Sequence, residues 1–108
     1  MNKIHVIRNR DIQNILIGTP NGHQHLRVCV KLKQGSTLIF QEATIANLLR
    51  AYVTIKTHPK IRAGKLEAET LTENQRKEGY AEHQLLETVA ENGEVEEEIS
   101  KLLEKGAI

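Results

Sequence analysis

The sequence predicts an α+β fold, in which a small antiparallel sheet has one face covered by a helix and is followed by a helical, acidic C-terminal extension. Three observations lead to this prediction. Apolar and polar residues alternate over 25–33, apolar residues recur at helical spacing over 42–58, and a narrow apolar stripe runs through the Glu-rich segment 95–105. A chain of 108 residues fits one small domain of this kind.

The predicted strands lie in the first seventy residues. The short apolar runs 3–7 and 12–17 are the first two, separated by a polar break. The clearest strand is 25–33, because strict alternation over this length indicates one buried and one exposed face. Its apolar face carries Leu26, Val28, Val30 and Leu32, and its polar face carries His25, Arg27, Cys29, Lys31 and Lys33.

Two turns connect these strands. In the segment 18–22, Pro20 presets the first turn angle, and Asn21 or Gly22 tolerates a positive one. No Gly-Lys-Ser/Thr follows it, so the segment is a turn and not a nucleotide-binding loop. The second turn, 34–36, has the odd length that returns the next strand in register. We expect Leu38 and Phe40 on the apolar face, and Gly35 to supply a left-handed conformation.

A helix is predicted over 42–58. Its apolar residues recur at helical spacing, with Glu42 at the positive end of the helix dipole and Lys56 at the negative end. A strand over 51–57 is the competing interpretation, because β-branched residues alternate there. Pro59 ends the element in either case, and 65–70 is one more short strand. The helical stripe consists of Ile45, Leu48, Leu49, Tyr52 and Ile55.

The chain changes character after residue 71. We predict a basic α+β body over 1–71, a polar linker over 72–79 and an acidic helical extension over 80–108. Within the extension, 80–93 resembles a helix that Asn92-Gly93 would stop, and 95–105 is the better-defined helix. The stripe of this last helix is a predicted partner-binding surface, because so short a helix is marginal alone and must dock on something. It comprises Val95, Ile99, Leu102 and Leu103.

The net charge of +1 hides a strong asymmetry. Residues 1–65 hold eleven Lys or Arg against two acids, whereas 66–108 hold four against twelve Glu. Such a division is typical of proteins that contact nucleic acid or membranes, and of acidic tails that fold back on a basic surface. The simpler interpretation is that both are solvated faces that keep the protein soluble.

The inventory of catalytic groups is thin, and we expect no enzyme, no catalytic residue, no cofactor and no metal site. Cys29 is the single cysteine, so no intrachain disulfide is available. His23 and His25 lie about 7 Å apart along a strand, but no third ligand completes a metal-binding spacing. The absence of a signal peptide and of an apolar run of about 20 residues predicts a cytoplasmic protein without membrane contact.

The basic half supplies the candidate nucleic-acid site. The segment 56–65 brings Lys56, Lys60, Arg62 and Lys65 together around Pro59, a composition suited to phosphate contact. Aromatic residues are missing from it, so we expect contact with a duplex backbone or structured RNA instead of base stacking. The predicted set is Arg27, Lys31, Lys33, Lys56, Lys60, Arg62 and Lys65.

Two functional hypotheses follow. The leading one is a non-enzymatic binding module that contacts nucleic-acid phosphates through its basic face, modulated by the acidic helices. The alternative is a homo-oligomeric assembly or adaptor protein, a dimer or larger, whose basic body and acidic tail form a subunit interface without nucleic acid. The three aromatic residues leave little bulky material for a core, which favours burial of apolar surface between subunits.

Overall fold

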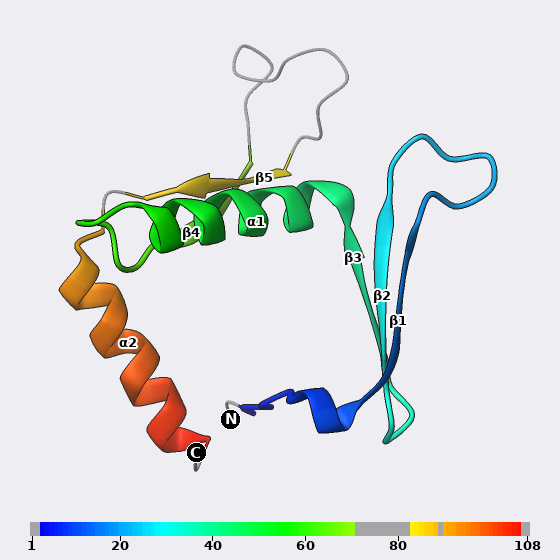
Figure 1. Cartoon of the computed structure of the whole chain (residues 1–108), viewed down its shortest axis with the longest axis horizontal. Helices are drawn as coiled ribbons and strands as arrows, with labels where there is room; N and C mark the ends of the chain where they lie inside the picture. The colour runs from blue at the N-terminus through cyan, green and yellow to red at the C-terminus, as the bar shows by residue number, and fades with distance from the viewer. Residues whose placement is uncertain (1–2, 71–82, 89, 107–108) are drawn as a thin grey trace. The chain divides into compact units, whose positions relative to one another are not determined.

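The computed structural model describes residues 3–70, 83–88 and 90–106 (Figure 1). The chain divides into two compact units. Unit 1 comprises 1–48 with 102–108, and unit 2 comprises 49–101. Antiparallel sheets and two helices make the fold α+β, as predicted. The predicted linker 72–79 lies outside the described residues, and the predicted boundaries stay predictions.

Unit 1 contains a three-stranded antiparallel sheet in the order β1-β2-β3. The strands are β1 (Ile12–Gly18), β2 (Arg27–Leu32) and β3 (Thr37–Gln41), and the 3-10 turn η1 (Asn9–Asp11) precedes them. The predicted strands at 12–17, 25–33 and 37–40 are therefore confirmed, but β2 begins only at Arg27, so His23 and His25 precede the strand and do not lie along it as expected.

The prediction that Leu38 and Phe40 lie on the apolar face of β2 is confirmed as well. Val30 lies opposite Leu38, and Val28 lies opposite Phe40, so the apolar residues of both strands share one face. Gly35 has a φ of 113° and Gly22 a φ of 80°, the positive values for which both turns select glycine. The observed connection covers residues 33–36, one residue more than the predicted turn over 34–36, and it leaves the apolar residues of both strands on one face.

The run 3–7 does not form the predicted strand. Residues 3–8 have no secondary structure, although the run is apolar. Instead Ile4 and Val6 approach Gly106 so closely that a methyl group on this glycine would lie 3.1 Å from Ile4 Cγ2 and 3.5 Å from Val6 Cγ2. A short apolar run becomes a strand only when another strand offers it a ladder, and here it packs against the C-terminal end of the chain.

Helix α1 (Glu42–Thr57) occurs where it was predicted and ends two residues before Pro59. Its second half belongs to unit 2, where it lies against the two-stranded antiparallel sheet formed by β4 (Leu66–Thr70) and β5 (His83–Glu87). Leu66 pairs with Glu87 and Ala68 pairs with Leu85 in this sheet. The strand considered for 51–57 does not form. The helical spacing of apolar residues extends through this β-branched segment, so the segment belongs to the helix.

Residues 83–87 form a strand and not the helix predicted over 80–93. The pairing of β5 with β4 is the physical reason, since it satisfies backbone groups that a lone strand would leave open. Asn92-Gly93 does not stop a helix either. It starts α2 (Asn92–Lys105), so the predicted helix at 95–105 is confirmed and begins three residues earlier.

The core is small. Among the described residues only Leu32 and Val95 are buried, and no side chain is fully enclosed. In the same part of the chain, fourteen large apolar side chains are exposed, including most of the α1 stripe. Few of the described apolar side chains are therefore buried.

Candidate functional site

The basic loop that follows α1 is built on its own histidine. His58 N–H donates to Thr54 O (2.9 Å), and the ring atom Nδ1 of His58 accepts from the backbone N–H groups of Lys60 (3.1 Å) and Ile61 (3.3 Å). Pro59 lies between them and prevents the helix from continuing. The ring thus organises the turn, a role that the sequence analysis did not assign to it.

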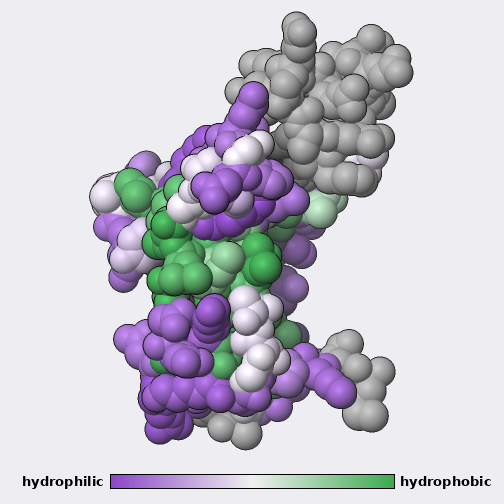
Figure 2. All heavy atoms as spheres, turned by 90° about the vertical axis from the view of Figure 1, so that its right-hand side faces the viewer, coloured by the Kyte–Doolittle hydropathy of each residue, from purple (hydrophilic) through white to green (hydrophobic). Residues whose placement is uncertain are grey.

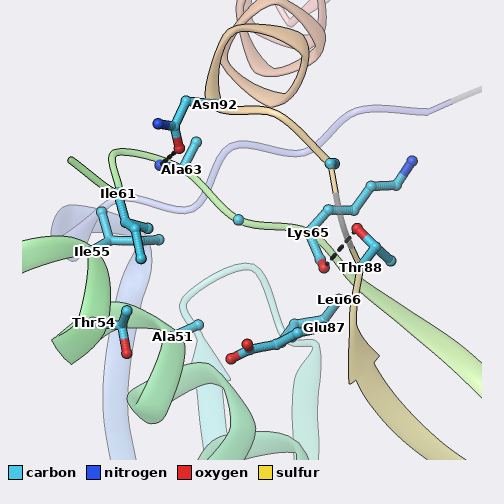
Figure 3. A pocket seen from close by; sticks show the side chains of 12 residues that line it. Ala51, Thr54, Ile55, Ile61, Ala63, Lys65, Leu66, Glu87, Thr88 and Asn92 are labelled. Atoms are coloured by element: carbon cyan, nitrogen blue, oxygen red, sulfur yellow. Dashed lines mark hydrogen bonds between the residues drawn. The ribbon is translucent and has the colours of Figure 1, made fainter. Parts of the chain in front are cut away.

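Asn92, the first residue of α2, holds the next part of the loop. Its Oδ1 accepts from the backbone N–H groups of Arg62 (3.1 Å) and Ala63 (3.2 Å), and its Nδ2 donates to Lys60 O (2.8 Å). Figure 3 shows the Asn92 side chain turned toward Ala63. Together, His58 and Asn92 thus accept hydrogen bonds from four consecutive backbone N–H groups of the loop, those of residues 60–63, which are therefore not free to bind phosphate.

Two cationic side chains of the basic loop also form ion pairs with the acidic helix α2. Arg62 Nε lies 3.0 Å from Glu96 Oε1, and Lys65 Nζ lies 3.7 Å from Glu98 Oε2 and 3.6 Å from Glu67 Oε1. All of these residues belong to unit 2. The pairs are half-exposed, so each contributes little to stability. Their effect is on availability, because a paired cation must exchange its partner before it contacts a phosphate.

The predicted phosphate-binding residues are divided between the two units. Arg27, Lys31 and Lys33 belong to unit 1, whereas the other four belong to unit 2. Arg27 Nη1 donates to His25 O (2.9 Å) and Leu26 O (3.3 Å), so part of its guanidinium is already bonded to backbone. Lys31, Lys33, Lys56 and Lys60 are exposed.

The predicted partner-binding stripe of α2 divides between the two units. Val95 and Ile99 belong to unit 2, and Leu102 and Leu103 belong to unit 1. Val95 is buried, as expected of a helix that docks, and the other three residues remain about half exposed. Part of the stripe is thus covered within the chain, and the rest is open to a partner.

The sequence analysis missed the exposed apolar surface of the unit 1 sheet. On one face Leu16, Cys29 and Ile39 form a row across the three strands, and Leu16 and Ile39 are 53% and 65% exposed. On the other face Ile15 and Ile17 are 48% and 67% exposed. In Figure 2 apolar side chains gather in a band between hydrophilic ends. Alternation of apolar and polar residues predicts one apolar and one polar face, but β1 has no charged residue on either face.

Unit 2 also contains a cavity of about 220 Å³ next to the basic loop (Figure 3). Ala51 and Ile55 of α1, Ile61 of the loop and Leu66 of β4 are among its lining residues, and the Lys65 side chain points away from it. Pockets for drug-sized ligands occupy roughly 300–1,000 Å³. The cavity is thus smaller than a typical ligand site, and its lining comes from α1, the basic loop and the adjoining ends of β4 and β5.

His25 has a partner other than a metal. Its Nδ1 lies 3.2 Å from Glu42 Oε2, and Glu42 Oε1 accepts the N–H of Leu26 at 3.4 Å. Within the described residues, no three His, Cys, Asp or Glu side chains gather as metal ligands do. In the same part of the chain, neither helix combines the length and the apolar character that crossing a bilayer requires.

The comparisons with known proteins give no identification, since no family model, curated protein or solved structure matches the chain.

Proposed function

We propose that the protein is a non-enzymatic, cytoplasmic assembly subunit that associates with further copies of itself. The observation that supports this proposal is the contrast between two buried apolar residues and fourteen large exposed ones in the described part of the chain. Burial of apolar area is worth roughly 25 cal/mol per Å², so exposed surface on this scale is a strong drive to association.

A second copy is the partner that best fits the charge. The chain carries a net charge of only +1, so two copies do not repel each other strongly. Residues 14–18 of β1, which include the exposed Ile15, Leu16 and Ile17, contain no charged side chain. A two-fold contact brings residues near the axis close to their own copies, so like charges would meet there, and an uncharged surface is favoured.

The experiment is sedimentation equilibrium over a wide range of protein concentration at moderate salt. We expect the average mass to rise from monomer toward dimer or a larger species. Because the drive is apolar, raising the salt concentration should leave the association unchanged or strengthen it. A mass that stays monomeric at every concentration would overturn the proposal.

Contact with nucleic-acid phosphates is the second candidate, and one observation favours it. The α2 carboxylates of Glu96 and Glu98 occupy Arg62 and Lys65, as carboxylates that compete with phosphates would do. In this scheme the acidic helix regulates the basic loop. The exposed Lys56 and Lys60 would make the first contact.

A salt series of binding to mixed duplex DNA and to structured RNA tests this candidate. Phosphate contact predicts affinity that falls steeply with salt, with a log–log slope of roughly −0.9 per phosphate neutralised on duplex DNA. The variant Lys60→Glu should bind more weakly. Failure of the protein to bind either nucleic acid at low salt would remove this candidate and leave self-assembly untouched.

A further inference from the structure

The outer edge of β1 lacks most of the features that normally protect the edge of a sheet. Within the described residues β1 pairs only with β2, so its other edge presents unpaired backbone N–H and C=O groups. Natural edges are blocked by charges, proline, bulges or a covering element. The strand Ile12–Gly18 contains no charged residue and no proline, and all of its residues after Ile12 are exposed.

The single irregularity of β1 leaves most of the strand available. The register against β2 shifts between Ile12 and Asn14, which places the bulge at Gln13. From Asn14 to Gly18 the pairing is regular. These five residues span about 17 Å, enough for a ladder to a further strand.

Other strands are less suited to self-pairing. β4 carries Glu67 and Glu69, so a second copy alongside it would bring like charges together. The edge strand β3 is short, and α1 begins at Glu42 directly after it. β3 is uncharged like β1, so charge disfavours β4, and the β1 edge is preferred over that of β3 because no α-helix follows it directly.

We propose that β1 of one copy pairs antiparallel with β1 of a second copy, in a register centred on Leu16. This inference rests on the proposed self-assembly and specifies which strands form the contact between the two copies. Two three-stranded sheets then become one six-stranded antiparallel sheet around a two-fold axis.

The symmetry restricts the register. An axis perpendicular to the sheet keeps each face on its own side, so one residue must lie opposite its own copy. A centre at Leu16 places Ile15 opposite Ile17 of the second copy, and every large side chain then meets another apolar one. A centre at Ile15 would place Leu16 opposite Asn14, and a centre at Ile17 would place Leu16 opposite Gly18. Only the first register matches all three apolar residues.

The same register continues the existing rows of the sheet. On one face the row Ile39, Cys29 and Leu16 meets its own copy across the axis. On the other face Ile17, which follows Val28 in its row, meets Ile15 of the second copy. Directly opposed side chains have Cβ atoms about 4.5–5.5 Å apart, so each row becomes a continuous apolar strip. A standard protein interface buries roughly 800 Å² on each partner. A contact of five paired residues per copy is much smaller than that, so we expect a weak dimer.

Cysteine cross-linking of the full chain tests the register, with Cys29→Ser as the common background. Under copper–phenanthroline, dissolved oxygen takes two electrons and two protons from a pair of thiols to form the disulfide. L16C should give a covalent dimer, because the axis residue meets its own copy within disulfide range. I15C is the matched control: it should not link to itself, since its copy lies two positions away, but it should link to I17C protein when the two are mixed.

Sedimentation of Leu16→Lys gives a second measure. It places two ammonium groups opposite each other, and we expect the dissociation constant to rise by at least about tenfold. Ile39→Lys makes the same change on the same face, two strands from the axis, and should have little effect. If the parent protein dimerises but neither L16C cross-linking nor Leu16→Lys responds, this inference is wrong and self-assembly stands. If the parent protein is always monomeric, both proposals are wrong.

Discussion

At the scale of single residues, a few side chains decide how the loop and turns are held. Asn92 makes three hydrogen bonds to the backbone of 60–63, and His58 accepts two from the same loop. The sequence analysis named neither role. Asn92 appeared there as a helix stop, because a polar residue before Gly is typical of such a position. Its partners lie about thirty residues away in sequence, so no local pattern could indicate them.

Asn92→Ala should loosen the basic loop. The substitution removes three hydrogen bonds in a half-buried position, each worth about 0.5–1.5 kcal/mol net, and water compensates in part. We expect the free energy of unfolding in urea to fall by about 1–2 kcal/mol, with faster hydrogen exchange at the amides of Arg62 and Ala63. Asn92→Asp keeps the acceptor and should lose less. Equal stability of Asn92→Ala and the parent protein would contradict this role.

Two glycine substitutions should act with opposite signs. Gly35 has a φ of 113°, and no atom lies within 4 Å of the position a Cβ would take, so Gly35→Ala costs only backbone strain, about 1–2 kcal/mol. Gly93 lies in α2 with equally open surroundings and no positive φ, and Gly93→Ala should stabilise the chain by about 0.5–1 kcal/mol. Urea denaturation measures both. A destabilising Gly93→Ala would show that this position is not helical in solution.

At the scale of elements, α2 explains the division of charge along the sequence. The first half of this acidic helix pairs with the basic loop inside unit 2, through Glu96 and Glu98. From the sequence, an acidic tail that folds back on its own basic surface and one that forms a subunit interface were both possible. The pairing within one unit supports the first possibility, and Val95 supplies the apolar contact that anchors the helix.

The double variant Glu96→Gln/Glu98→Gln should free the loop cations without unfolding the helix. Exposed ion pairs contribute about 0–1 kcal/mol, so we expect only a small loss of stability. If the loop binds phosphates, affinity for duplex DNA at low salt should rise. The control Glu94→Gln/Glu97→Gln makes the same change in charge, and Glu97 pairs with Lys101 on its own helix. Equal gains in both variants would indicate a general effect of charge and not release of the loop.

At the scale of the whole molecule, the two units share one property, a shortage of buried apolar area. The described residues include only two buried apolar side chains. A chain of this size ordinarily buries a core of its own, so we infer that association completes it. The exposed residues of the α1 stripe offer further surface for such contacts.

Stability should therefore depend on protein concentration. If folding is coupled to association, the midpoint of thermal unfolding rises with concentration, because mass action favours the associated state. We expect a higher midpoint in concentrated samples of the parent protein and a smaller dependence for Leu16→Lys. Differential scanning calorimetry of both proteins over the same concentrations makes the comparison. A midpoint that is independent of concentration in the parent protein would contradict the coupling.

The sequence by itself determined what depends on near neighbours. Alternation fixed β2, the short turn at Gly35 fixed which face the apolar residues of β3 share with β2, helical spacing and Pro59 fixed α1, and the stripe with its Glu residues fixed most of α2. Only the tertiary structure decided what depends on distant pairing. It made 83–87 a strand because β4 was there to pair with, left 3–7 without a strand to pair with, and brought Glu96 to Arg62. The physical reason is that short apolar and charged segments carry no unique local preference, and the partner that the rest of the chain supplies selects their conformation.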